Sequence, residues 1–100
     1  MRVVLSPTAK IRLRNIAEYY REKAGVRVSR KVKNRIVQGL RELPKYAAGC
    51  PIETQFMEEG MEHRKFKVGV YGIIFRIENG MILVSDIFDR RRDPETMHGE

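Results

Sequence analysis

The residues best suited to chemistry lie in the second half of the chain, where cationic and apolar side chains alternate. His63, Lys65 and Lys67 occupy alternate positions, Arg76 lies in the next apolar run, and Arg90–Arg92 follow the last one. Alternate side chains of a strand share one face of a sheet, so we expect a basic face that holds phosphate groups. The predicted nucleic-acid or target-binding residues are Lys65, Lys67, Arg76, Arg90, Arg91 and Arg92. The alternative is that these residues only solvate the open side of the sheet.

Catalysis at this face would require a proton acceptor and a proton donor in addition to the cations. Cleavage of RNA needs a base for the 2′-hydroxyl and an acid for the leaving oxygen. The candidates for these roles are Glu62, His63, Asp86, Asp89 and His98. His63 begins the basic run, so the predicted catalytic set is His63 with Lys65 and Arg90, in which arginine stabilises charge on phosphate. The alternative for His63 is an incidental histidine at the start of a strand.

Other chemistries find little support in the sequence. The spacing of the histidines, the single cysteine and the acidic residues matches no metal site, P-loop or dinucleotide motif, so neither a metal nor a cofactor is predicted. Cys50 lies in a Gly-Cys-Pro loop with no base nearby, which argues against a nucleophile. A single cysteine, with no signal peptide or long apolar run, predicts a cytoplasmic protein without membrane association.

The composition is that of a small basic globular protein. Its 100 residues predict one domain over 1–100, with a loosely ordered tail at about 94–100. The net charge is +7, and a second group of cations lies at Arg30, Lys31, Lys33 and Arg35. This surplus favours an anionic partner such as nucleic acid, a ribosome or an acidic protein segment.

The first half predicts a strand and two helices. Ser6-Pro7 ends a short apolar run and begins a helix, because serine caps free N–H groups and proline fits the first turn. Apolar residues then recur at spacings of three and four until Gly25. A second helix is expected to begin near Ser29, with Pro44 at its end or in its last turn. The short link predicts an antiparallel helical hairpin.

The second half predicts three strands after an irregular segment over residues 47–61. Gly69 separates the first two strands, and Asn79-Gly80 predicts a tight hairpin because both positions favour positive φ. A two-residue turn places Phe75 opposite Val84 and Ile77 opposite Ile82. The same register sets Asp86 on the face of Ile73, so either Asp86 lies at the rim of the sheet or a bulge shifts the register.

These elements predict an α+β fold in the order β-α-α-β-β-β. The last three strands form an antiparallel meander, and the first strand joins at an edge or beside the last strand. Both helices pack on one face, because their apolar stripes need a sheet to cover. The other face stays partly open and basic.

The C-terminal blocks resemble the RelE/ParE toxin superfamily, the plasmid-stabilisation type of type II toxin–antitoxin toxin. The similarity is carried by Arg64–Val68, Tyr71–Ile77 and Val84–Pro94, together with Val3–Pro7 before two helices. It covers nearly the whole chain. Within this superfamily, Lys65, Lys67 and Arg90 fall where RNA-cleaving relatives place functional cations.

The resemblance implies one of two toxic activities. RelE-like members are metal-independent, ribosome-dependent mRNA endoribonucleases, and ParE-like members inhibit DNA gyrase. Gly72 and Asp89 stand where RNA-cleaving relatives carry arginine and histidine, and no tyrosine follows Pro94, which favours the ParE-like branch. The resemblance also implies a cognate antitoxin that neutralises growth inhibition, with operator DNA bound only through that antitoxin. A degenerate chain that only binds its antitoxin is a further alternative.

Overall fold

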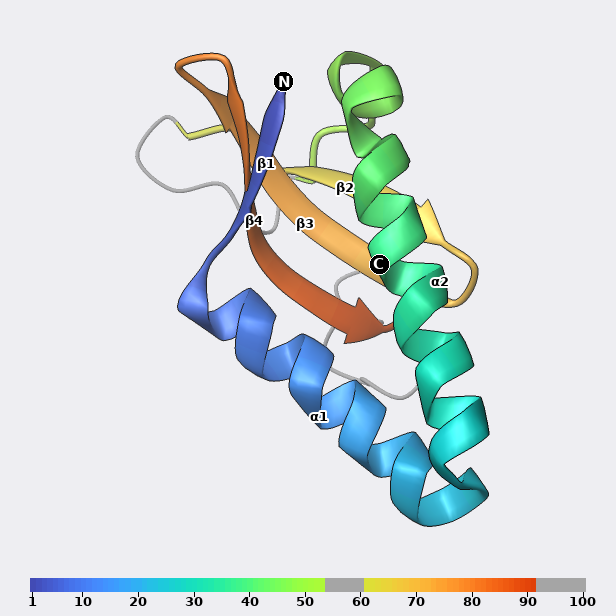
Figure 1. Ribbon diagram of the computed structural model, residues 1–100. Helices are drawn as coiled ribbons and strands as arrows, with labels where there is room; N and C mark the ends of the chain where they lie inside the picture. The colour runs from blue at the N-terminus through green and yellow to red at the C-terminus, as the bar shows by residue number, and fades with distance from the viewer. Residues whose placement is uncertain (54–60, 92–100) are drawn as a thin grey trace.

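The computed structural model describes residues 1–53 and 61–91 of the chain. Its elements are β1 (Arg2–Leu5), α1 (Pro7–Ala24), α2 (Val26–Tyr46), a short 3-10 helix (Ala47–Gly49), β2 (Arg64–Val68), β3 (Tyr71–Glu78) and β4 (Met81–Asp89) (Figure 1). No described helix is long and apolar enough to cross a membrane. The order of the elements is the predicted β-α-α-β-β-β.

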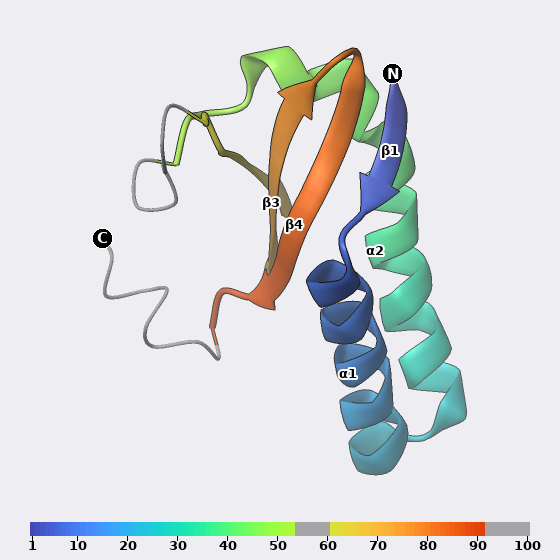
Figure 2. The same ribbon diagram turned by 90° about the vertical axis from the view of Figure 1, so that its left-hand side faces the viewer.

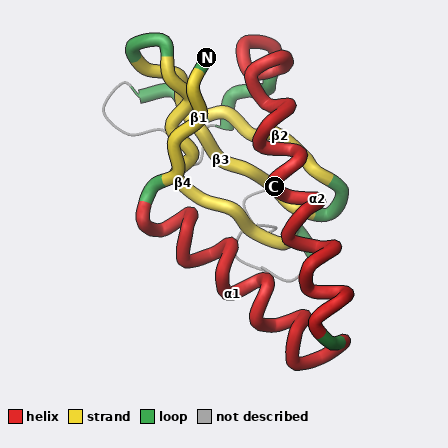
Figure 3. Tube along the Cα trace, in the orientation of Figure 1, coloured by secondary structure: helices red, strands yellow, loops and turns green. Residues whose placement is uncertain are grey.

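The four strands form one mixed sheet in the order β1-β4-β3-β2 (Figure 3). Strands β2, β3 and β4 are the predicted antiparallel meander, and β1 joins the edge of β4 in parallel. The expected α+β arrangement, with the first strand beside the last, is therefore confirmed.

Both helices lie on the same side of the sheet (Figure 2). The core forms where apolar residues of α2, among them Ile36 and Leu43, meet Ile73 and Phe75 of β3 and Val84 of β4, all of which are fully buried. Burying side chains of this size is worth about 1.5–3 kcal/mol each, so this contact fixes the helical hairpin on the sheet. We call the side of the sheet away from the helices the far face.

The helix ends follow the sequence closely, with one correction. The hydroxyl of Ser6 accepts a hydrogen bond from the amide of Ala9 at 3.0 Å, which is the predicted cap. Helix α2 begins at Val26 rather than near Ser29, because Gly25 with φ +95° links the helices by itself. The Ser29 hydroxyl instead donates to the Ala17 carbonyl at 2.6 Å and ties the helices together.

The end of α2 agrees with the expectation that Pro44 lies at the end or in the last turn. The helix continues past Pro44 to Tyr46, with Pro44 inside it near its end. A proline there removes one backbone hydrogen bond, and the α-helix gives way two residues later to the 3-10 turn.

The hairpin between β3 and β4 has the predicted turn and a bulge. Asn79 and Gly80 have φ of +51° and +75°, and Phe75 pairs with Val84 as expected. The register then shifts, because Ile74 pairs with Asp86 and leaves Ser85 as the extra residue. Asp86 therefore lies on the far face rather than on the face of Ile73, and it binds Arg12 of α1 at 3.2 Å.

The far face is less open than the sequence suggests. Ile74 is 1% exposed and Phe88 is 5% exposed. The Phe88 ring lies so close over Gly72 that a Cβ atom there would come within 2.6 Å of the ring. Apolar packing therefore occupies part of the face on which we expected a continuous basic surface.

Candidate functional site

Three of the predicted binding residues share the far face. Lys65 and Lys67 of β2 pair with Ile74 and Gly72, and Arg76 of β3 follows on the same side. Cross-strand partners point to the same side of a sheet, so the alternation in the sequence located these side chains correctly.

Two of these three cations have an acidic neighbour. Lys65 binds Glu53 at 3.3 Å, and Arg76 binds Glu78 at 3.1 Å. Arg64, which lies on the helix side of β2, binds Glu62 at 3.4 Å and the Cys50 carbonyl at 2.6 Å. The pairs of Lys65 and Arg76 reduce the net positive charge that the far face presents to a partner.

Lys67 belongs instead to a group of cations around the turn between β2 and β3. The Arg90 guanidinium donates to the Gly69 carbonyl at 3.3 Å, and its backbone N–H donates to the Val70 carbonyl at 2.8 Å. The guanidinium of Arg35 of α2 also lies near this turn, since a Cβ atom at Gly69 would lie 3.7 Å from it. We call Arg35, Lys67 and Arg90 the Gly69 cluster.

The Gly69 cluster borders a shallow hollow of about 150 Å³, lined among others by Arg35, Lys67 and Gly69. Glu42 also lines it and accepts a hydrogen bond from Gln38 at 3.2 Å. The three cations come from α2, β2 and the segment after β4, so the folded chain, rather than one stretch of sequence, brings them together. An anionic group of a partner would meet guanidinium and ammonium donors here.

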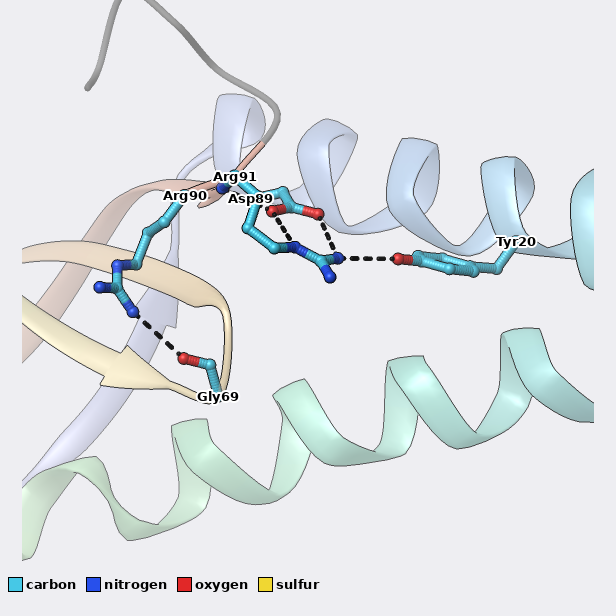
Figure 4. Close-up of polar contacts among 5 residues, drawn as sticks. All are labelled: Tyr20, Gly69, Asp89, Arg90 and Arg91. Carbon is cyan, nitrogen blue, oxygen red and sulfur yellow. Dashed lines mark hydrogen bonds and ion pairs between the residues drawn. The ribbon is translucent and has the colours of Figure 1, made fainter. Parts of the chain in front are cut away.

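Arg91 has a different role from Arg90 (Figure 4). Its guanidinium holds both carboxylate oxygens of Asp89, at 3.3 and 3.1 Å, and also donates to the Tyr20 hydroxyl of α1 at 3.4 Å. Asp89 is 8% exposed, and the Arg91 backbone N–H donates to the same carboxylate at 2.9 Å. The arrangement fastens the end of β4 to α1, so Arg91 is engaged within the fold.

Tyr71 is the cross-strand partner of Asp89 in the pairing of β3 with β4. Burial raises the pKa of the Tyr71 hydroxyl, and its hydrogen bond with Tyr20 and the negative charge of Asp89 raise it further. The hydrogen bond and charge of Asp89 raise the pKa of the Arg91 guanidinium in turn. The phenol therefore stays protonated and the pair stays charged at neutral pH.

The predicted catalytic residues do not converge on one point. His63 lies just before β2 and Gly69 just after it, so the six intervening steps of extended chain separate His63 from the Arg90 contact by about 20 Å. The Nδ1 atom of His63 is buried and has no hydrogen-bond partner in the described part of the chain. One phosphate group cannot contact His63 and Arg90 together across this distance.

Cys50 and the remaining candidates add no reactive centre to the described structure. The Cys50 thiol donates to the Tyr46 carbonyl at 3.3 Å, and burial raises its pKa despite the nearby charge of Arg64. A thiol held protonated is a weak nucleophile. Within residues 1–53 and 61–91, no three His, Cys, Asp or Glu side chains are grouped as metal ligands. Arg92, His98 and the expected tail at 94–100 lie outside the described residues.

Comparison with known proteins identifies the family. The model of the ParE toxin of the type II toxin–antitoxin system parDE matches residues 3–94. The chain belongs to the ParE toxin family. No curated protein matches the sequence.

A solved structure supports the fold of this ParE family member independently. The chain is similar to a chain of the chromosomal ParDE toxin–antitoxin system from P. aeruginosa, with a TM-score of 0.74 and 19% identity. The match covers 89% of this chain and 95% of the other. The predicted superfamily is thereby confirmed, and the protein is a toxin of a type II toxin–antitoxin system.

Sequence reasoning missed Arg35 as a member of the candidate site. In the sequence it is one of four neighbouring cations in a helix. Its position one residue before the buried Ile36 does indicate a side chain at the border between α2 and the sheet. Its proximity to Gly69 depends on how α2 crosses β2, and a local sequence pattern does not predict that crossing.

Proposed function

We propose that this ParE family member stops growth by acting on DNA gyrase and that a cognate antitoxin neutralises it. The Gly69 cluster makes the contact with the target in this proposal. The observation that carries it is the convergence of Arg35, Lys67 and Arg90 from three elements on one turn. Converging cations are suited to binding an anionic group that is presented by a partner.

The arrangement supports binding better than cleavage. Arginine and lysine stabilise negative charge, but RNA cleavage also needs a positioned acid and base. His63 lies at the opposite end of β2 from the cluster. Of the acidic candidates, Asp86 is bound to Arg12 and Asp89 to Arg91. A gyrase inhibitor requires recognition of its target and no such proton transfer.

Paired substitutions in the Gly69 cluster test this proposal. We expect Lys67→Ala with Arg90→Ala to relieve growth arrest and to abolish trapped covalent gyrase–DNA complexes in cells. The matched control is Arg2→Ala with Lys23→Ala, which removes the same charge from two exposed positions elsewhere. The control is expected to remain toxic, and co-expression of the antitoxin is expected to restore growth.

The same cultures distinguish the other activities. Cleavage of mRNA within codons at the ribosomal A site, with no trapped gyrase, would replace the proposal with a ribosome-dependent endoribonuclease. Unchanged growth on expression of the native chain would leave only antitoxin binding. A folded double variant that remains as toxic as the control would exclude the Gly69 cluster as the target contact.

A further inference from the structure

The net positive charge of the chain resides in its helices and not in the sheet. Residues 7–46 contain twelve of the twenty Lys and Arg but only three of the thirteen Asp and Glu, which gives this stretch a net charge of +9. The rest of the chain has a net charge of −2. An anionic partner that is drawn to this protein is therefore drawn mainly to the helical hairpin.

A groove of about 350 Å³ runs between α1 and α2, and all of its lining residues belong to these two helices. Its cations are Lys10, Arg14 and Arg21 of α1 and Lys33 of α2, which we call the basic groove. The three α1 residues are spaced by four and seven, so they follow one side of the helix over about 16 Å. Such a row matches an extended anion better than a small one.

The basic groove is separate from the Gly69 cluster. Lys33 and Arg35 are two residues apart on α2, so their side chains project about 200° apart around the helix. Lys33 lines the basic groove, and Arg35 lines the hollow beside Gly69. The two surfaces can be changed independently.

The cations of the basic groove also differ from those of the sheet in their partners. Among the described residues, Arg12 is the one helical cation in an ion pair, and its partner Asp86 belongs to β4. No cation of the basic groove forms an ion pair with another described residue. Glu18 is the single acidic residue in the lining. The charge of the groove is therefore available to a partner.

The apolar content of the groove favours a polyanion over a peptide. A helical or extended peptide anchors itself through large apolar side chains in apolar pockets. The exposed large apolar residues of the hairpin are Ile11, Val26, Val28 and Tyr46, and none of them lines the groove. Its apolar lining is limited to Leu13 and Ala17. A phosphate backbone needs only regularly placed cations.

We propose that the basic groove binds the phosphate backbone of nucleic acid directly, through Lys10, Arg14, Arg21 and Lys33. This inference does not depend on the target proposed above, because no residue of the Gly69 cluster takes part. It assigns the toxin chain a contact with nucleic acid of its own, in addition to any that an antitoxin provides.

Salt-dependent binding of the purified full chain to labelled nucleic acid tests the proposal. Four phosphate contacts predict a slope of about −3.6 in log K against log salt for duplex DNA, and a slope of about −2.8 for a single strand. The variant Arg14→Ala, Arg21→Ala and Lys33→Ala removes three contacts, so its slope on duplex DNA is expected to fall to about −0.9. The matched control is Arg2→Ala, Lys23→Ala and Lys45→Ala, which removes the same charge outside the groove lining and is expected to retain the native slope.

Each other result would overturn the proposal. An unchanged slope in the groove variant would exclude the basic groove as the binding site. An equal loss of slope in the control would show that binding depends only on the net charge of the protein. Tighter binding of a polyglutamate peptide than of nucleic acid of equal charge would assign the groove to an acidic protein. Circular dichroism of every variant confirms that it is folded, which is expected because the substituted side chains are exposed. Growth assays are not needed, so failure of the gyrase proposal leaves this test intact.

Discussion

The helical hairpin and the C-terminal sheet use their cations in opposite ways. In the sheet and the segments that flank it, Arg64, Lys65, Arg76 and Arg91 each bind a carboxylate. In the hairpin, the described cations other than Arg12 have no such pair. The region whose pattern first suggests a binding face is therefore largely neutralised, and the less patterned region carries the charge.

This difference shows what the alternation of residue types in a strand can and cannot predict. Alternation determines which side chains share a face, as for Lys65 and Lys67. It does not determine whether a carboxylate comes close, because Glu53 reaches Lys65 through a segment that folds back along β2. Counting charges over the hairpin would have identified the basic region without any structure.

The largest expected effect concerns the packed far face of the sheet. We expect Phe88→Ala to lower the free energy of unfolding by about 3–5 kcal/mol, because it empties a buried site beside Ile74. Gly72→Arg, which introduces the residue of RNA-cleaving relatives, is expected to cost about 1–3 kcal/mol because the Phe88 ring occupies its space. Urea unfolding followed by circular dichroism measures both changes.

The double variant Gly72→Arg with Phe88→Ala sharpens this test. If the ring excludes the arginine, the two costs are less than additive, because the new side chain fills the vacated space. Simple additivity would mean that Gly72 is required for some other reason. The control Arg14→Ala, on the hairpin, is expected to change the free energy of unfolding by less than about 0.5 kcal/mol.

How much of the fold was predictable depends on the range of the interactions involved. Ser6-Pro7, Gly25 and Asn79-Gly80 each act on adjacent residues, so the elements and their order could be derived from them. Local sequence does not decide between the bulge at Ser85 and an unbroken register, because the bulge depends on contacts made across the molecule. The Ser6 hydroxyl donates to the Ser85 carbonyl at 3.1 Å over a separation of 79 residues.

The candidate site was less predictable for the same reason. Lys67 and Arg90 were identified from their types and positions, but the turn at which they meet Arg35 depends on how α2 crosses β2. Arg91 could not be told apart from Arg90 in the sequence. The structure separates them, because Arg91 turns toward Asp89 and Tyr20 while Arg90 turns toward Gly69 (Figure 4).

A smaller effect is expected at the contact between β4 and α1. Tyr71→Phe removes a buried hydroxyl whose pKa is raised by burial, by Tyr20 and by Asp89, and is expected to cost about 1 kcal/mol at neutral pH. The raised pKa of Tyr71 also has a consequence in alkali. The unfolded chain loses this proton near pH 10.0 while the folded chain keeps it, so the stabilising contribution is complete below that pH and is lost above it.

We therefore expect the native chain to lose stability more steeply above about pH 10 than the Tyr71→Phe variant does. Urea unfolding at a series of pH values measures the difference. Tyr46→Phe is the matched control, because its ring is exposed and stacks on Phe66 with centroids 5.9 Å apart. Parallel curves for the native chain and Tyr71→Phe would show that Tyr71 is not the group responsible.

The smallest expected effect on stability distinguishes the paired cations of the sheet from the cations of the basic groove. Arg76→Gln removes an ion pair with Glu78 and is expected to lower stability by about 0.2–1 kcal/mol at low salt.

Arg14→Gln removes a charge that lies among like charges in the basic groove. We expect it to leave stability unchanged or to raise it by a few tenths of a kcal/mol, because it relieves repulsion. Thermal unfolding at low and high salt should show the two variants diverging at low salt and converging at high salt, where both interactions are screened. If both substitutions lowered stability equally at low salt, the hairpin cations would be held by partners within the fold, and the contrast between the two regions would not hold.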